Sequence, residues 1–222
     1  MMRAARLVMV GIAALTAPSA YAQEIVNGSF EFPVLPAGSF TNFLGGATAI
    51  TGWTVVGVDS TVVNRFTQNG ITFQAQEGNQ WIDLAGVTSN SRTSGVTQDV
   101  ATSVGQLYAL RFYVGSATDN LFFFPGTVDL SINGGARMGF TNPTAPGDRL
   151  DWRAFTVEFT ATSATTNLTF FNGSAPDNFL GALDNVSLRA VPAATIPEPT
   201  SLVLLGAGLI AGGISSRRRK NA

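Results

Sequence analysis

The chain contains neither histidine nor cysteine, so its possible chemistry is limited to carboxylates, hydroxyls, amides and arginines. Ser-His-Asp and Cys-His nucleophilic systems are therefore excluded, and the usual zinc, copper and haem sites lose their ligands. The remaining groups suit calcium, sugars, or a pair of acids of the glycosidase type. Asp83, Asp129 and Glu158 are candidates for such a pair. No sequence spacing places two of them about 5–10 Å apart around a cleft, however.

Aromatic residues are the second group of candidates, because sugar sites combine aromatic faces with amide and carboxylate groups. Trp53 and Trp81 fall in predicted strands and are expected to fill the core, whereas Trp152 stands among charged residues. Residues 119–126 (DNLFFFPG) fall where a loop is expected, and large apolar residues there form either a satellite core or an exposed contact site. A further loop, 172–179, carries Asn and Asp groups that are also ordinary turn residues. The candidate ligand-binding residues are Phe122, Phe123, Phe124 and Trp152.

Short strands are the elements that must position these residues. Apolar and polar residues alternate with a period of two in 108–114, 155–160 and 168–171, which places one face on a core and the other toward water. Other candidate strands are 25–30, 53–56, 61–66, 80–84, 96–100, 127–132 and 182–190. About nine or ten such strands in one domain predict an all-β fold, an antiparallel β-sandwich or jelly roll.

The first 22 residues have the features of a secretory signal peptide. Arg3 and Arg6 precede an apolar stretch at 7–15. The small residues Ala20 and Ala22 then form a cleavage site, and cleavage there leaves Gln23 as the first residue. Signal peptidase is therefore an expected partner during export.

The C-terminal segment combines three features in a fixed order. Pro197, Glu198 and Pro199 are followed by an uncharged apolar run at 202–214 and then by a basic cluster, Arg217, Arg218, Arg219 and Lys220. A helix over the apolar run is about 20 Å long, short of the ~30 Å hydrocarbon core, and the basic residues are expected to stay on the cytoplasmic side. We therefore expect a temporary membrane span.

This order closely resembles the PEP-CTERM sorting signal of Gram-negative bacteria. The resemblance implies that a membrane protease-transpeptidase, exosortase, recognises the motif, removes the tail and releases the protein toward the cell surface. The expected organisation is a signal peptide at 1–22, a β-sandwich domain at 23–191, a tether at 192–196 and a sorting signal at 197–222.

The span between these signals is acidic. Residues 23–196 contain seven arginines, no lysine and thirteen carboxylates, a net charge of −6. Such a domain is a poor binder of nucleic acid, whose phosphates require the opposite charge. It could attract divalent cations or a cationic polymer.

Several short motifs follow one another through the domain. They are 27–31 (NGSFE), 52–53 (GW), 77–84 (EGNQWIDL), 95–100 (GVTQDV), 105–110 (GQLYAL) and 183–188 (LDNVSL). Their order resembles the galactose-binding-like jelly rolls, which include several carbohydrate-binding modules and a plant cell-wall domain family of undefined activity. The resemblance implies the fold more than a function.

Asp184 conflicts with the strand pattern, because it shares parity with Val186 and Leu188, which should point inward. A carboxylate in a core-facing row is costly unless it is paired or bound to metal. The resemblance implies a structural calcium at the positions of Glu31 and Asp184, with backbone carbonyls completing the shell. Alternatively, Asp184 hydrogen-bonds backbone amides at the start of its strand.

Together these features predict an exported, exosortase-sorted protein of the cell surface or the exopolysaccharide matrix of a biofilm, one that binds carbohydrate without enzymatic activity. One alternative is a structural matrix protein that assembles through protein–protein contacts. Another is a glycan-active enzyme that uses two carboxylates.

Overall fold

The computed structural model describes residues 25–118, 125–144, 147–176 and 178–192, and every regular element among them is a β-strand. The predicted all-β antiparallel sandwich is therefore confirmed. The chain divides after Val191 into two compact units, the first of which holds all the strands. The strands are β1 (Ser39–Leu44), β2 (Thr54–Val56), β3 (Asp59–Asn64), β4 (Phe66–Gln68), β5 (Ile71–Phe73), β6 (Gln80–Asp83), β7 (Gly95–Ala101), β8 (Leu107–Ser116), β9 (Gly126–Ile132), β10 (Met138–Asn142), β11 (Asp151–Thr160), β12 (Thr165–Asn172) and β13 (Ala182–Ala190).

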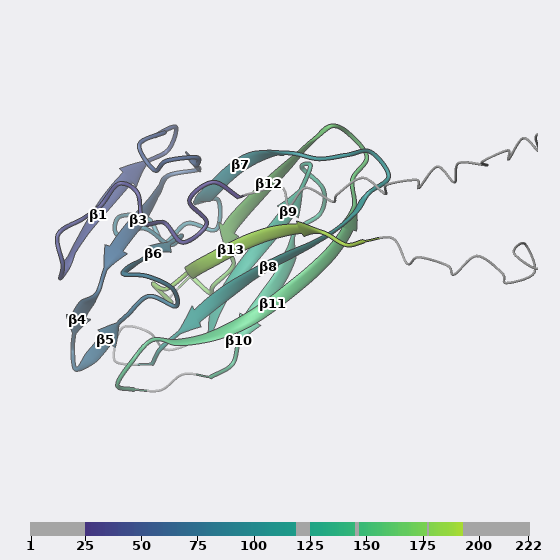
Figure 1. Ribbon diagram of the computed structural model, residues 1–222. Helices are drawn as coiled ribbons and strands as arrows, with labels where there is room; N and C mark the ends of the chain where they lie inside the picture. The colour runs from purple at the N-terminus through teal and green to yellow at the C-terminus, as the bar shows by residue number, and fades with distance from the viewer. Residues whose placement is uncertain (1–24, 119–124, 145–146, 177, 193–222) are drawn as a thin grey trace, which may run out of the picture. The chain divides into compact units, whose positions relative to one another are not determined.

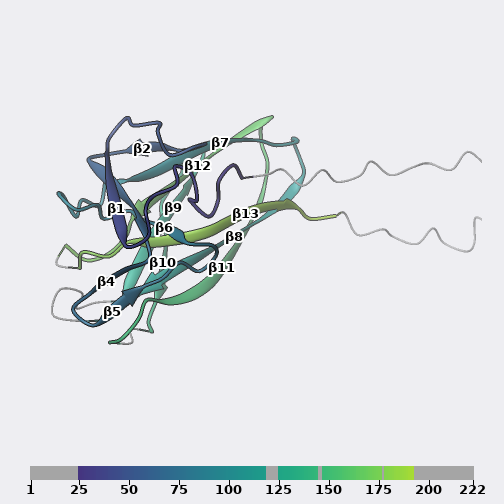
Figure 2. The ribbon, with the colours of Figure 1, turned by 60° about the vertical axis from the view of Figure 1, so that its left-hand side comes forward.

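Two antiparallel sheets form the sandwich (Figure 1). The six-stranded sheet has the order β1-β3-β6-β13-β8-β11, and the five-stranded sheet has the order β10-β9-β12-β7-β2. The last strand, β13, lies in the middle of the larger sheet between β6 and β8, as both ribbon views show (Figure 2). The larger sheet therefore combines the first and the last strand of the domain, β1 and β13.

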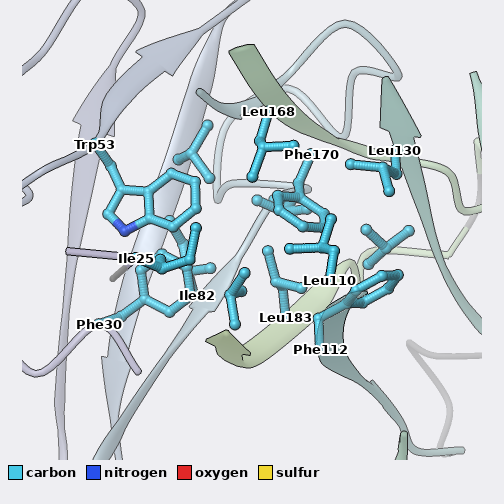
Figure 3. Packing of buried hydrophobic residues seen from close by; sticks show 14 of the residues in the cluster. Ile25, Phe30, Trp53, Ile82, Leu110, Phe112, Leu130, Leu168, Phe170 and Leu183 are labelled. Atoms are coloured by element: carbon cyan, nitrogen blue, oxygen red, sulfur yellow. The ribbon is translucent and has the colours of Figure 1, made fainter. Parts of the chain in front are cut away.

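The main core lies between the two sheets (Figure 3). Phe112 on β8 meets Phe170 on β12 edge-on, with ring centroids 5.1 Å apart, and Trp53 packs on Phe170 from the other side at 6.2 Å. All three side chains are almost fully buried. Aromatic pairs in this geometry add to the free energy gained by burying their area.

A second apolar cluster covers the outer face of the six-stranded sheet. The β4–β5 hairpin folds over this face, so that Ile71 and Phe73 pack with Val63, Trp81 and their neighbours. The backbone of Thr72 holds the hairpin in place, because it exchanges hydrogen bonds with Asp148 and Leu150. The hairpin covers Val63, and the 86–89 segment covers Asp59. All six residues of β3 are therefore buried, whereas simple alternation predicts that one face is exposed to water.

The predicted strand at 25–30 is wrong. The backbone turns there, with positive φ at Asn27 and Phe30 and a hydrogen bond from the Phe30 N–H to the Asn27 carbonyl. The side chain of Gln98 replaces a neighbouring strand, since its amide both donates to and accepts from the backbone of Val26. Four strands were not predicted, β1, β4, β5 and β10, since the predicted strand at 61–66 reaches only the first residue of β4.

The described residues include no helix that could span a membrane. The expected signal peptide with Ala20, Ala22 and Gln23, the sorting residues Pro197, Glu198, Pro199, Arg217, Arg218 and Arg219, and the loop residues Phe122, Phe123 and Phe124 lie outside the described part of the chain.

Candidate functional site

A pocket of about 350 Å³ opens where the β4–β5 hairpin meets the outer face of the six-stranded sheet. Its floor comes from two paired strands, because Thr61 and Val63 on β3 lie opposite Asp83 and Trp81 on β6. We call it the aromatic pocket, after five of the residues that line it. The lining residues are Phe40, Thr61, Val63, Phe66, Gln68, Phe73, Trp81, Asp83, Gly86, Val87, Phe179 and Leu180.

The aromatic rings of the pocket form a continuous row. Phe40 meets Phe66 at 5.5 Å, Phe66 meets Phe73 at 6.5 Å, and Phe73 stacks on Trp81 at 6.3 Å, all between ring centroids. Phe179 stands at the mouth with about half of its surface exposed. The pocket thus presents large apolar surfaces to a ligand, with few polar groups among them.

Asp83 is the ionisable residue of this lining. Its Oδ1 accepts hydrogen bonds from the backbone N–H groups of Ala85 (3.0 Å) and Gly181 (2.9 Å), whereas Oδ2 accepts none from the described residues. Burial raises the pKa of the Asp83 carboxyl to about 7, against the effect of these two donors, and the negative charge of Asp59 adds to the rise. The group therefore changes charge near neutral pH.

Asp59 is on the same sheet face but has a different environment. Its side chain is fully buried and accepts hydrogen bonds from Thr88, Ser89 and Asn42. Burial opposes ionisation of Asp59, but these donors together hold its pKa below the usual value. Gly86 closes over it, since a Cβ at that position would lie 2.4 Å from the carboxylate. Asp59 is thus a structural carboxylate.

Trp152, the predicted ligand contact, lies behind the pocket and not among the residues that line it. Its ring packs edge-on against Trp81 at 6.0 Å, and its indole N–H donates to the Gln74 carbonyl at 3.0 Å. Trp53 fills the main core as predicted. Trp81 is also buried as predicted, but in the outer cluster, where it forms part of the pocket lining.

A second polar site gathers three of the sequence motifs. Asp184 accepts hydrogen bonds from the backbone N–H groups of Gln76, Glu77 and Asn185 at 2.7, 3.0 and 2.7 Å. Glu31 accepts two from Asn79 and Gln80, both at 2.7 Å. The N–H of Val186 also donates to the Gly28 carbonyl at 2.9 Å. Residues 28–31, which we call the opening segment, are thus joined to the 76–80 loop and to β13 at one place.

The parity argument for Asp184 is wrong, because a β-bulge interrupts β13. The register shifts between Asp184 and Ser187, and Asn185 has a φ of 49°. Leu183 and Val186 consequently both face the main core, and Asp184 lies opposite Tyr113. Asp184 is fully buried even so. Burial raises its pKa to about 8, the three N–H donors oppose this, and the charge of Glu31 raises it further.

The fit of this second site to calcium rests on its two carboxylates. Glu31 and Asp184 repel each other electrostatically, and no salt bridge pairs either of them with a basic residue of the described chain. Glu31 Oε2 accepts no hydrogen bond from the described residues. No group of three or more acidic side chains forms in this part of the chain. A cation held here would therefore need backbone or amide oxygens as well.

A family model, described as "Protein of unknown function (DUF642)", matches residues 23–189. The chain belongs to the DUF642 family. A second model, the PEP-CTERM protein-sorting motif, matches residues 195–220. This motif indicates an exported surface protein that is processed at the membrane of a Gram-negative bacterium. Comparison with curated proteins found no match.

The DUF642 domain is similar in fold to several solved structures of low identity. They include an exo-β-1,3-galactanase from Phanerochaete chrysosporium in complex with β-1,3-galactotriose (18% identity, TM-score 0.42, covering 68% of this chain and 29% of that one). A GH26-CBM35 β-(1,4)-mannanase from Podospora anserina matches with 10% identity and a TM-score of 0.44, covering 72% and 29%. A family 35 carbohydrate-binding module from Clostridium thermocellum matches with 16% identity and a TM-score of 0.40, covering 68% and 98%. The chain thus spans less than a third of the two enzymes.

The DUF642 domain does not bring the three candidate catalytic acids into one cleft. Asp83 lies in the aromatic pocket, and Glu158 is exposed on the edge strand β11 of the same sheet. Asp129 lies on β9 of the other sheet, where it forms a salt bridge with Arg92 at 3.2 Å.

The aromatic pocket was missed in the sequence because it depends on tertiary structure. Phe66 ends the predicted strand 61–66 and Phe73 falls in no predicted strand, so the pattern gives no indication that a hairpin folds back over the sheet here. One signal does exist in the sequence: β3 and β6 carry apolar residues on both faces, as Val62 and Val63 or Trp81 and Ile82 illustrate. Strands of this kind are buried on both sides.

Proposed function

We propose that this protein is exported, processed by exosortase and lodged at the cell surface or in an exopolysaccharide matrix, where it binds carbohydrate without converting it. The observation that supports this proposal is the aromatic pocket. Its volume of about 350 Å³ lies in the range of small-ligand sites, and its size suits one sugar unit of a polymer. Its aromatic surfaces suit the apolar faces of a pyranose ring.

The polar groups of the pocket support recognition of hydroxyl or amine groups. Gln68 and Asp83 are placed among the aromatic side chains, so a ligand meets polar groups at a few positions, whereas the buried Thr61 hydroxyl donates to Asn42 at 2.7 Å. Sites that bind small ligands commonly combine apolar walls with a few such groups.

The burial of Asp59 supports a binding role over catalysis. A glycosidase of the usual kind needs two carboxyl groups that flank the scissile bond. The pocket offers Asp83, but the neighbouring Asp59 is covered by the 86–89 segment and held by four hydrogen bonds. A substrate in the pocket therefore meets one carboxyl group, which can bind and orient it.

We also propose that a structural calcium ion is held by Glu31 and Asp184. The ion would neutralise two carboxylates that repel each other without a basic partner. It would also strengthen the junction between the opening segment and β13. It takes no part in ligand binding in this proposal.

The test is binding of the purified full-length chain to a panel of bacterial and plant polysaccharides, with a Val87→Trp variant, whose bulk fills the pocket mouth, as the pocket-blocked control. Val87 lies at the pocket mouth and is about half exposed, so the change should leave folding intact. Saturable binding that the variant loses supports the proposal. Binding that the variant retains contradicts the assignment to this pocket. Hydrolysis of any glycan would replace the binding role by an enzymatic one.

A second candidate function is assembly of a protein matrix, and the edge strand β1 favours it. No charged residue occurs between Glu31 and Asp59, and β1 ends the six-stranded sheet with Phe40 and Leu44 exposed. Uncharged edge strands pair readily with other chains. Light scattering over a concentration series tests this function. A particle mass that increases with protein concentration, and no longer does so in a Leu44→Lys variant, supports assembly. A particle mass that stays constant excludes it.

A further inference from the structure

Asp83 has no counter-charge in the aromatic pocket. No other residue of the lining is ionisable, and the charged group that acts on it, Asp59, has the same sign. The hairpin contributes Phe66, Gln68 and Phe73, and the opposite wall contributes Gly86, Val87, Phe179 and Leu180, all of them uncharged. Asp83 is half-buried, and a carboxylate withdrawn from water without a partner is costly, so the ligand is the available source of positive charge.

The aromatic side chains around Asp83 favour the same kind of ligand. Cations are attracted to the faces of aromatic rings, with Trp the strongest, and rings around a pocket are a known means of binding ammonium groups. Five of the twelve residues that line this pocket are aromatic. When Asp83 is ionised, its carboxylate adds a negative charge to the partial charges of the rings, and Oδ2 accepts no hydrogen bond from the described residues.

The charge of the whole domain supports capture of a cationic polymer. Residues 23–196 have seven arginines, no lysine and thirteen carboxylates. The summed negative potential raises the local concentration of positively charged ligands.

We propose that the aromatic pocket binds an amino-sugar unit with a free ammonium group, within a cationic polysaccharide. This inference rests on the proposed carbohydrate-binding function and names its ligand class. The ammonium group pairs with Oδ2 of Asp83, and the apolar face of the sugar ring packs on the aromatic side chains. An N-acetylated unit lacks the charge and leaves the carboxylate unpaired.

The charge state of Asp83 makes binding depend on pH. Burial raises the pKa of the free group to about 7, and a bound cation lowers it because it stabilises the carboxylate. Binding therefore releases a proton below pH 7, and affinity increases with pH until the free carboxyl is ionised. Choline is a suitable probe, since its own charge does not change with pH.

The experiment compares the binding of four probes to the full-length chain by calorimetry: a glucosamine tetramer, an N-acetylglucosamine tetramer, cellotetraose and an oligolysine peptide. We expect the glucosamine tetramer to bind at least tenfold more tightly than the other three. Asp83→Asn should remove this preference, because its Oδ1 still accepts from Ala85 and Gly181 but its charge is gone. Glu158→Gln, an exposed acid on β11, is the control and should change nothing. Choline should bind about tenfold more weakly at pH 6 than at pH 8.

Each other outcome overturns the inference in a distinguishable way. Equal binding of the glucosamine and N-acetylglucosamine tetramers, or an Asp83→Asn variant with an unchanged preference, overturns the amino-sugar assignment but leaves carbohydrate binding in place. Binding of cellotetraose alone also overturns the amino-sugar assignment and leaves carbohydrate binding in place. Tighter binding of oligolysine than of the glucosamine tetramer replaces the sugar by a basic protein partner. If no sugar binds and the polysaccharide panel is also negative, the proposed function fails as well.

Discussion

Asp59 and Asp83 project from the same face of two paired strands, yet only Asp83 opens into the aromatic pocket. Thr61, two residues after Asp59 on β3, lies directly opposite Asp83 on β6. Asp59 is fully buried under the 86–89 segment, whereas Asp83 lines the pocket and only its Oδ1 accepts hydrogen bonds from the described residues. Burial and hydrogen bonds thus give two neighbouring aspartates opposite pKa shifts.

Phe179→Ala should weaken glycan binding without lowering stability. Phe179 lines the pocket with about half of its surface exposed, so its removal costs little core packing. An aromatic contact contributes about 0.5–1.5 kcal/mol beyond the area that it buries, which corresponds to a loss of up to about tenfold in affinity. The measurement is titration with the tightest-binding oligosaccharide. Phe32→Ala, an equally exposed phenylalanine outside the pocket, is the matched control, and an equal loss there would contradict the prediction.

The folded state should lose stability as the pH rises from about 5 to 8 in the presence of chelator. Asp83 and Asp184 have pKa values of about 7 and 8 in the folded state, against a usual value of 3.8. Between these values the folded chain holds more protons than the unfolded chain, so the free energy of unfolding decreases with increasing pH. The urea midpoint at pH 5 and at pH 8 measures this.

The Asp83→Asn variant provides the control for that measurement, because it removes one of the two titrating groups and should reduce the pH dependence. Asp59 does not contribute in this window: its pKa is lowered, so its contribution is lost only when the pH falls below the usual range of aspartate. A midpoint that is constant or rises from pH 5 to 8 would show that the two carboxyls are already ionised in the folded state.

Calcium should raise the melting temperature if Glu31 and Asp184 hold the ion. An ion bound to the folded state alone stabilises it in proportion to the logarithm of the free ion concentration above the dissociation constant. Glu31→Gln should remove most of this increase, while Glu158→Gln should retain it. The same melting temperature in calcium and in chelator, together with no metal in the purified protein, would remove the calcium proposal.

Gly78→Ala should destabilise the fold more than Gly134→Ala. Both glycines have nearly the same positive φ, 67° and 68°, so the backbone strain of a side chain is similar, about 1–2 kcal/mol. A Cβ at Gly78 would lie 2.3 Å from Glu31 Oε1, whereas nothing lies within 4 Å of the corresponding Cβ at Gly134. The difference between the two variants in the free energy of unfolding, measured in urea, gives the cost of the contact between the new Cβ and Glu31. Equal losses of stability would mean that Glu31 moves aside at no cost.

The fold was largely predictable because most strands carry a period-two pattern. Residues 155–160 and 182–190 were predicted within a few residues of β11 and β13. β5 was missed because it is only three residues long. The strand at 25–30 was predicted wrongly because positive φ angles at Asn27 and Phe30 turn the chain where the pattern suggests extension.

The candidate site was only partly predictable. Asp83 was recognised as a possible functional acid, and Trp81 is buried as predicted. Its position in the lining of the pocket was not predicted, whereas Trp152, the predicted ligand contact, packs against Trp81 outside that lining. The reason is that period-two alternation cannot tell which outer face a hairpin will cover. Alternation also fails at Asp184, because the bulge at Asn185 adds one residue to β13. The residues before the bulge therefore face the opposite side from the one that alternation predicts.

The central position of β13 has a consequence for export. The six-stranded sheet cannot close until its last strand is inserted between β6 and β8, and the Gly28–Val186 hydrogen bond joins the two ends of the domain. Folds that depend on such distant pairings form slowly. A chain threaded through a membrane from its N-terminus would therefore stay in a translocatable state until almost all of the domain has crossed, and would complete its fold on the outer side.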